Sequence, residues 1–467
     1  MATGGPLLGV VGALVLCCGA PRFNRIALRP FPWAPGRLGG ERAAGPPDPL
    51  DRGAATPEIR RSMAHDPYAA LRYREYRSFL GASFAVALGT QVQTAVLGWQ
   101  VYAITGDPLS LGLVGLAEAL PFLALTLLGG WAADRLDRRL LSLLSAAAIC
   151  ASGAWVLVVS LGQPRSALPF YAVQALAGVG RAFYRPAFSA LGSELVPREH
   201  YHNATSWRVS LFHTAQVLGP AAGGLLIALG GPRSAYAVVV LLLLAGIGLM
   251  AAIAPRPRPS APRGRVLADL GDGVRFVFAE PLLLGTMSLD LFAVLFGGAT
   301  ALLPVFARDV LGTGEVGFGL LRAAPAVGSV AMSLLLARRG HFERSGRALL
   351  WAVAFFGVSW IAFALSTSYA LSLVLLAAGG ALDSISVVLR GTLVQLRTPP
   401  DKMGRVAAVN SFFIGSSNEL GAFESGLAAR LLGTVPSVVF GGMMTLVTVG
   451  LVAWRAPALR RLGRLVQ

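Results

Sequence analysis

The sequence predicts an all-α, polytopic membrane protein. Of its 467 residues, 55% are hydrophobic and only 13% are charged, and the mean hydropathy is +0.64. Lipid cannot hydrogen-bond a peptide backbone, so long apolar segments in a bilayer fold as helices or as a closed barrel. The apolar runs of this chain do not alternate with a period of two residues, which excludes the barrel.

Twelve apolar runs are candidate membrane spans, because each approaches the roughly 20 residues needed to cross about 30 Å of hydrocarbon. The first six cover residues 79–103, 109–132, 140–161, 167–190, 205–229 and 234–254. The second six cover residues 282–306, 315–337, 348–366, 369–396, 405–430 and 434–454. We therefore expect twelve transmembrane helices.

A proline-rich break from Pro255 to Pro262 separates the two groups of spans. The segment after it, Val266 to Glu280, mixes apolar and charged residues, which is typical of an amphipathic helix lying in the membrane interface. The predicted organisation is a six-helix half at 63–254, a cytoplasmic linker with an amphipathic helix at 255–281, and a second six-helix half with its tail at 282–467.

Residues 1–62 do not fit this plan, because they are rich in Pro, Gly and Arg. We interpret them as a disordered extension or an overcalled start, with Met63 beginning the protein proper. A signal peptide is less favoured, because no basic segment precedes the apolar stretch from Leu7 to Leu16.

Basic residues cluster in alternate loops and predict the orientation of the chain. The net charge of +17 would indicate nucleic-acid binding in a soluble protein, but here the arginines lie in short loops between apolar runs, as the positive-inside rule describes. The cationic loops contain Arg72, Arg74, Arg77, Arg135, Arg138, Arg139, Arg256, Arg258, Arg263, Arg265, Arg338, Arg339, Arg344, Arg347, Arg397, Lys402 and Arg405. We expect these loops and both termini to be cytoplasmic, in a cell (inner) membrane, with no nucleic-acid partner. The alternate loops hold few cations and are predicted to be outer; they lie at residues 106–108, 162–166, 230–234 and 366–369.

The chain lacks the motifs of a nucleotide-driven pump. A phosphate-binding P-loop needs Gly-Lys followed by Ser or Thr, and the only lysine, Lys402, is followed by Met403. The histidines and cysteines show no zinc spacing, and we expect neither a metal nor another cofactor. Energy for any transport would therefore come from an ion gradient or from the gradient of the substrate.

Two loop and helix motifs stand out. Between the second and third spans the chain reads GGWAADRLDRR, with Gly130 and Asp134 followed by three arginines. In the fifth span it reads Gly219-Pro220-Ala-Ala-Gly223-Gly224. The arginines of the first motif are Arg135, Arg138 and Arg139.

With these motifs the chain resembles the major facilitator superfamily over about residues 69–464. The first motif matches that family's loop between its second and third helices, except that Asp137 replaces a usual glycine, and the second is similar to its antiporter motif. The stretches SLDLFAVLFGG from Ser288 and SSNELGAFESG from Ser416 resemble the enterobactin-exporter-like, drug:proton antiporter branch with twelve transmembrane helices. The resemblance implies two pseudosymmetric six-helix halves that rock about a central cavity, in a protein that we expect to be a monomer.

The resemblance also implies roles for the motifs. Asp134 would latch the cytoplasmic side by binding backbone N–H groups at a neighbouring helix end, with Arg135, Arg138 or Arg139 completing the gating cluster. The alternative is that Asp134 caps the third helix and the arginines only set topology. The motif of Gly219, Pro220, Gly223 and Gly224 would act as a hinge and a seal, or alternatively as ordinary small-residue helix packing.

Charged residues inside the spans are candidates for a cavity, because each costs about 2.5 to 3.5 kcal/mol at the centre of an inserted helix and needs a partner or water. The set is Glu118, Arg181, Asp290, Arg322, Asp383, Arg390 and Glu419. A proton-coupled exporter needs a carboxyl whose charged form is disfavoured by desolvation, and Glu118, Asp290 and Asp383 are our candidates. Static ion pairs with Arg181, Arg322 or Arg390 are the alternative for each of them.

The leading hypothesis is a secondary active exporter of small molecules that works by proton antiport. Within the same class, a siderophore (enterobactin-like) or metabolite exporter is the alternative; from another class, a non-transporting membrane receptor or scaffold. We find no paired catalytic motif, so we do not expect an enzyme. The substrate stays open, because acidic groups would attract cationic amphiphiles and Arg181 and Arg322 would receive an anionic siderophore.

Overall fold

The structure is a computed structural model that describes residues 66–255, 266–339, 342–399 and 402–463. The described residues form helices and no strand, so the predicted all-α class is confirmed. The extension at 1–62 and most of the proline-rich break lie outside the described residues.

The first half of the described chain contains five long helical elements. A short 3-10 turn, η1 (Ala69–Arg72), precedes them, and η2 (Arg198–His200) lies between the fourth and the fifth. The long elements are α3 (Arg74–Thr105), α4 (Pro108–Arg135), α5 (Arg138–Leu161), α6 (Leu168–Glu194) and α7 (Tyr201–Ala251). The first four each contain one predicted span.

Helix α7 contains two predicted spans joined through a turn. Its 51 residues are interrupted at Gly231, whose φ of 72° and ψ of −179° are not helical. Only glycine adopts such a backbone readily, and Pro232 after it cannot donate the next helical hydrogen bond. The sequence Gly230-Gly231-Pro232 therefore ends one helix and begins the next at the predicted outer loop.

The second half begins with the amphipathic helix and continues through six more predicted spans. Helix α8 (Val266–Ala279) lies where the amphipathic segment was expected, and Lys402 stacks on the ring of its Phe276 at 5.0 Å. The further elements are α9 (Pro281–Gly297), η3 (Ala299–Leu302), α10 (Leu303–Val305), η4 (Phe306–Val310), α11 (Gly314–Arg339), α12 (Ser345–Leu365), α13 (Tyr369–Arg397), α14 (Met403–Leu432), α15 (Thr434–Arg455) and α16 (Pro457–Arg460).

The span expected at 282–306 is broken rather than continuous. Helix α9 ends at Gly297, and η3, α10 and the π-helical η4 follow in short pieces up to Val310. The paired glycines Gly297 and Gly298 favour an end at this point, and Pro304 has no N–H to continue the helical ladder.

Nine helices among the described residues are long and apolar enough to cross a membrane, with α7 counted once. Helices α6 and α14 do not meet the same hydropathy criterion, although they are 27 and 30 residues long. At about 1.5 Å per residue both are long enough to span, and they contain two of the charged residues singled out above, Arg181 and Glu419. With α7 divided at Gly231, the arrangement is consistent with the twelve predicted spans.

Large apolar side chains cover much of the outer surface of the bundle. Leu229 is 77% exposed and Trp454 is 72% exposed, and many further Leu, Val and Phe side chains are exposed on most of the long helices. Soluble proteins rarely expose so much apolar surface. These side chains therefore face lipid.

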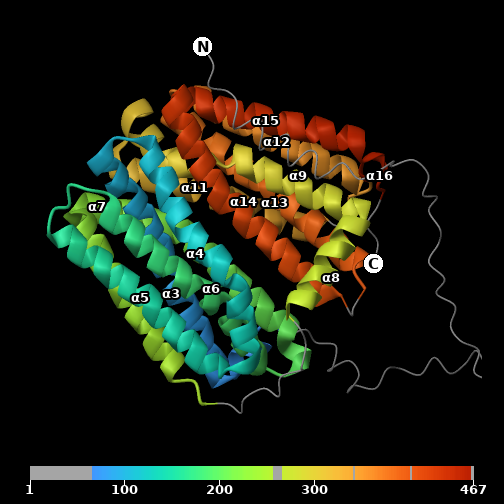
Figure 1. The fold of residues 1–467 in the computed structure, drawn as a ribbon, viewed down its shortest axis with the longest axis horizontal. Helices are drawn as coiled ribbons and strands as arrows, with labels where there is room; N and C mark the ends of the chain where they lie inside the picture. The colour runs from blue at the N-terminus through green and yellow to red at the C-terminus, as the bar shows by residue number, and fades with distance from the viewer. Residues whose placement is uncertain (1–65, 256–265, 340–341, 400–401, 464–467) are drawn as a thin grey trace, which may run out of the picture. The chain divides into compact units, whose positions relative to one another are not determined.

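The helices pack in two groups that Figure 1 shows as blue-to-green and yellow-to-red sets. In the first group α3 packs on α7, and α6 packs on α4 and α5; in the second, α13 packs on α11 and α12, and α15 on α9 and α12. The two groups meet along two seams, one between α4 and α14 and one between α7 and α11. The antiporter-like motif of α7 lies at one of these seams and Glu118 and Glu419 at the other.

Candidate functional site

Glycines bring the backbones together at the α4–α14 seam. A Cβ added to Gly426 would lie 2.8 Å from the Cα of Gly112, and a Cβ added to Gly112 would lie 3.0 Å from the carbonyl oxygen of Phe423. Side chains do not fit at such distances, so small residues are required here. Gly112 is close to the loop that contains Asp107, which places this contact at the predicted outer end of the seam.

The antiporter-like motif of α7 forms the corresponding contact at the other seam. A Cβ on Gly224 would lie 2.9 Å from the Cα of Gly319 in α11, and a Cβ on Gly319 would lie 2.6 Å from the carbonyl oxygen of Pro220. Gly219 and Gly223 instead face α3, where their nearest side-chain atoms belong to Gln91, Val96 and Ala95. The motif therefore packs against its own half on one side and against the opposite half on the other.

Polar and aromatic contacts also join the two halves at the predicted outer ends. The hydroxyl of Tyr102 donates a hydrogen bond to Asp309, and Arg430 forms an ion pair with Asp107 at 3.0 Å. The rings of Trp99 and Phe318 are 5.3 Å apart, within one cluster of buried apolar side chains that extends through both halves. Together with the glycine contacts, these interactions join the predicted outer ends of the two halves.

A group of charged side chains lies deeper in the same interface. Glu118 of α4 is buried and pairs with Arg181 of α6 through one carboxylate oxygen, while its other oxygen accepts a hydrogen bond of 2.8 Å from Gln174. Both partners of Glu118, Gln174 and Arg181, lie on α6, about two helical turns apart. The predicted cavity residues Glu118 and Arg181 are thus brought together, as a hydrogen-bonded ion pair.

Three further charged residues surround this pair. Glu419 of α14 interacts electrostatically with Glu118, Arg181, Arg185 and Arg322, and its carboxylate lies 3.8 Å from the position of a Cβ on Gly115. Arg185, one turn from Arg181, is exposed and lies 5.7 Å from the centre of the Phe122 ring. We refer to Glu118, Arg181, Arg185, Arg322 and Glu419 as the central charge cluster.

A second ionic site lies inside the C-terminal half. Arg390 of α13 pairs with Asp290 of α9, and the two side chains are only 5% and 8% exposed. Asp290 and Asp383 both line a small cavity, about large enough for one water molecule, together with Ser386. Although Asp383 and Arg390 are two turns apart on one helix, the partner of Arg390 is on a different helix.

The hydrogen bonds and ion pairs of the predicted gating loop lie, among the described residues, within its own half. The guanidinium of Arg138 pairs with Glu194 at 2.5 Å, and Arg139 donates a hydrogen bond of 2.7 Å to the carbonyl of Ala251. Arg135 lies 5.0 Å from the Trp131 ring centre.

Gly130 has open space around its Cα. Asp134 is exposed and forms no hydrogen bond or ion pair with another described residue.

The cap of α5 is Asp137 rather than Asp134. The side chain of Asp137 accepts a hydrogen bond of 2.9 Å from the backbone N–H of Leu140, as expected of an N-cap aspartate. The residue that departs from the family's usual glycine therefore has a local structural role, and Asp134 remains available for another.

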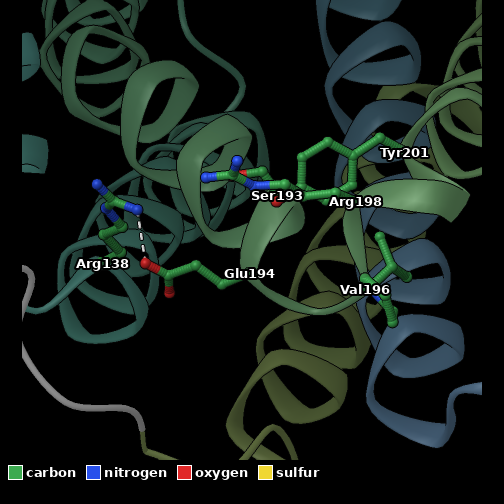
Figure 2. A pocket seen from close by; sticks show the side chains of 7 residues that line it. Arg138, Ser193, Glu194, Val196, Arg198 and Tyr201 are labelled. Carbon is green, nitrogen blue, oxygen red and sulfur yellow. Dashed lines mark hydrogen bonds and ion pairs between the residues drawn. The ribbon is translucent and has the colours of Figure 1, made fainter.

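A surface pocket of about 500 Å³ lies beside this loop, lined by residues from the ends of α5, α6 and α7. Figure 2 shows the Arg138–Glu194 pair at one side of it and Tyr201 at the other, with Arg198 between them. Since Glu194 neutralises Arg138 in this arrangement, the pocket is not a simple cationic site.

A family model described as transmembrane secretion effector matches residues 65–462 of the chain. The chain belongs to this family. The family is a branch of the major facilitator superfamily, so the resemblance seen in the motifs is confirmed.

Two curated relatives are similar over most of their length. The multidrug efflux pump Tap of Mycolicibacterium fortuitum is 28% identical over 402 residues, which is 82% of this chain and 96% of that protein. The enterobactin exporter EntS of Escherichia coli O1:K1 / APEC is 28% identical over 386 residues, or 79% of this chain and 88% of that protein. This transmembrane secretion effector is therefore a transporter and not an enzyme.

Solved structures show the same fold at low sequence identity. The POT family transporter PepTSo matches with a TM-score of 0.65 at 13% identity, covering 83% of this chain and 98% of that one. The human organic anion transporter MFSD10 (TETRAN) matches with a TM-score of 0.57 at 16% identity, covering 82% and 99%. At these identities the match establishes the fold alone.

Several residues of this family member's site were missed by sequence reasoning. Tyr102, Asp309, Asp107 and Arg430 occupy predicted loops or helix ends, where charged residues are ordinary. Arg185 was recognisable as lying one turn from Arg181. No sequence signal paired Glu194 with Arg138, because that contact depends on how α5 and α6 cross.

Proposed function

We propose that this transporter is a secondary active exporter that moves small molecules out of the cell by proton antiport with alternating access. The two relatives described above are named as a multidrug efflux pump and an enterobactin exporter, and both export. The chain covers nearly all of each relative. Siderophore or metabolite export is the alternative within the class, and the enterobactin exporter is what favours it.

The observation that carries the proposal is the central charge cluster at the interface of the two halves. Glu118 and Arg181 come from the first half, whereas Glu419 and Arg322 come from the second. A relative movement of the halves would change the distance between Glu419 and the Glu118–Arg181 pair. The electrostatic cost of charging Glu419 would change with it, which is the property that a proton-coupling carboxyl needs.

Asp383 and Asp290 receive different roles in this proposal. Asp290 is held by Arg390 in a buried ion pair, and each charge supplies the partner that the other needs in a membrane interior. We assign this pair to holding α9 on α13. Asp383, which forms no ion pair with a described residue, is the second candidate for carrying a proton.

The remaining assignments follow the family resemblance. Gly130, Asp134, Arg135, Arg138 and Arg139 would gate the cytoplasmic side, and Gly219, Pro220, Gly223 and Gly224 would form the hinge between halves. The working unit would be a monomer in the cell (inner) membrane with both termini cytoplasmic, and its partners would be substrate, protons and lipid.

Purified protein in liposomes with an imposed proton gradient tests the proposal. A panel of dyes and catechol compounds is offered, and substrate movement is measured together with proton flux by an internal pH indicator. We expect Glu419→Gln to abolish proton-coupled movement and Asp383→Asn to reduce it. Glu199→Gln, an exposed carboxyl outside the spans, is the matched control and should behave as wild type.

The outcomes separate the competing functions. Substrate movement that ignores the proton gradient would refute antiport. Specific binding without any movement of substrate would favour the receptor or scaffold. Unchanged proton flux in both Glu419→Gln and Asp383→Asn would remove these carboxyls from the coupling mechanism.

A further inference from the structure

The central charge cluster contains more guanidinium groups than carboxylates. Arg181, Arg185 and Arg322 all interact electrostatically with Glu419, and the cluster contains only one further carboxyl, Glu118, so it has a positive excess even when both carboxyls are ionised. Protonation of either carboxyl would increase that excess. The question is which of these groups remain available to a ligand.

The carboxylate of Glu118 is already fully engaged. One oxygen accepts from Arg181 and the other accepts from Gln174 at 2.8 Å. Arg181 in turn reaches Thr94, whose hydroxyl oxygen lies 3.5 Å from its second terminal nitrogen. A cationic substrate would therefore have to displace an existing partner to reach Glu118.

Arg185 and Arg322 are in the opposite situation. Neither guanidinium forms a hydrogen bond or an ion pair with a described residue. Arg185 is exposed beside the Phe122 ring, and Arg322 faces Glu419 from α11. The two lie on helices of different halves, α6 and α11, and both interact with Glu419.

A guanidinium in a membrane interior whose N–H groups have no hydrogen-bond acceptor needs an anion or water. It presents a planar array of donors that fits a carboxylate in a bidentate geometry. We propose that Arg185 and Arg322 determine specificity by selecting substrates with a negative charge, so that the exported class consists of organic anions such as carboxylates. The inference rests on the proposed export function and names its substrate class.

Two fluorescent dyes with the same xanthene ring system test the sign of this selection. Carboxyfluorescein is anionic and rhodamine 123 is cationic, and the binding of each to purified protein is measured by fluorescence anisotropy. We expect the wild type to bind carboxyfluorescein at least about tenfold more tightly, which corresponds to about 1.4 kcal/mol. Arg185→Gln and Arg322→Gln should each remove most of that preference.

A variant that removes a negative charge from the cluster distinguishes substrate recognition from a purely structural role of these residues. Glu419→Gln removes a negative charge and should tighten the binding of carboxyfluorescein, whereas a purely structural role would make it weaken binding as the arginine variants do. Arg322→Lys keeps the charge and should retain part of the preference. Arg165→Gln, an exposed arginine of a predicted outer loop, is the control for nonspecific surface charge.

Several results would overturn the inference. These are a wild-type preference for rhodamine 123, no binding of carboxyfluorescein, or the same dye preference in wild type and both arginine variants. If rhodamine 123 but not carboxyfluorescein moved with proton coupling, the export function would be supported and anion selection refuted. Arginine-dependent binding of carboxyfluorescein without proton coupling would leave anion selection standing and refute antiport.

Discussion

The predicted outer ends of the two seams and the predicted cytoplasmic gating loop are held in contrasting ways. At the outer ends, Gly112 contacts Gly426, Gly224 contacts Gly319, and Arg430 pairs with Asp107, all across the two halves. Among the described residues, the hydrogen bonds and ion pairs of the gating loop lie within its own half, as the Arg138–Glu194 pair illustrates. With the orientation and the alternating access proposed above, we infer that the structure represents the outer-closed end of the transport cycle.

This contrast explains why Asp134 lacks the partner that the family resemblance implies. A latch on the cytoplasmic side would form only when that side closes. In an outer-closed conformation the aspartate is expected to be exposed, and it is. The latch stays a prediction about a second conformation, and the outer glycine contacts are the features that define the first.

The largest effect is expected from blocking the outer closure at the α7–α11 seam. Gly224→Val would place side-chain atoms where the backbone of Gly319 lies, and overpacking of this kind costs about 1 to 3 kcal/mol. The cost applies only to the outer-closed state. Transport should therefore fall roughly ten- to hundredfold, as 1.4 kcal/mol corresponds to a factor of ten.

The matched variant is Gly248→Val in the same element, because a Cβ there meets no atom within 4 Å. It shares the change in helix propensity from glycine to valine but not the clash. Spin labels at Ser166 and Thr367, which are exposed in predicted outer loops of opposite halves, report the opening. Equal transport and equal label distances in both variants would show that the glycine contact does not control closure.

Sequence predicted the helices well because it needed only long apolar runs and helix-breaking residues. Gly230-Gly231-Pro232 marked the turn inside α7. The sequence did not predict that the span beginning at Leu282 breaks after Gly297. An apolar run alone does not indicate where 3-10 and π-helical segments will form within it. Packing against neighbouring helices decides such local departures.

The second prediction concerns the gating loop and is smaller. Asp134→Asn leaves the outer-closed state unchanged, because Asp134 has no partner there among the described residues. It removes a carboxylate from the expected helix-end site in the other state, where such a charge is worth about 0.3 to 1 kcal/mol. The population should shift toward outer-closed by about two- to fivefold.

The same pair of spin labels measures this shift, and transport is assayed in parallel. Asp137→Asn is the control because asparagine serves as well as aspartate at the N-cap of α5. If Asp134→Asn transports normally at normal expression, and the label distances do not change, Asp134 is not a latch.

The ionic partners within the bundle were only partly predictable. The sequence identified Glu118, Arg181, Asp290 and Arg390 as costly charges that need partners. It did not assign the pairs, because each pair joins two helices far apart in sequence. For each carboxyl the sequence left a static pair with Arg181, Arg322 or Arg390 open, and the structure pairs Arg390 with Asp290.

The smallest effect is expected from the ion pair between Asp107 and Arg430 across the outer seam. Its side chains are 36% and 55% exposed, and exposed pairs contribute about 0.2 to 1 kcal/mol. A double-mutant cycle with Asp107→Asn and Arg430→Gln, read from the spin-label populations, should give a coupling in that range that decreases as salt is added. Asp107 also caps α4 through Leu109, and asparagine preserves that hydrogen bond. A coupling well above this range would mean that charge, rather than glycine packing, holds the outer ends together; a small one would leave backbone contact as the main restraint that the transport cycle must release.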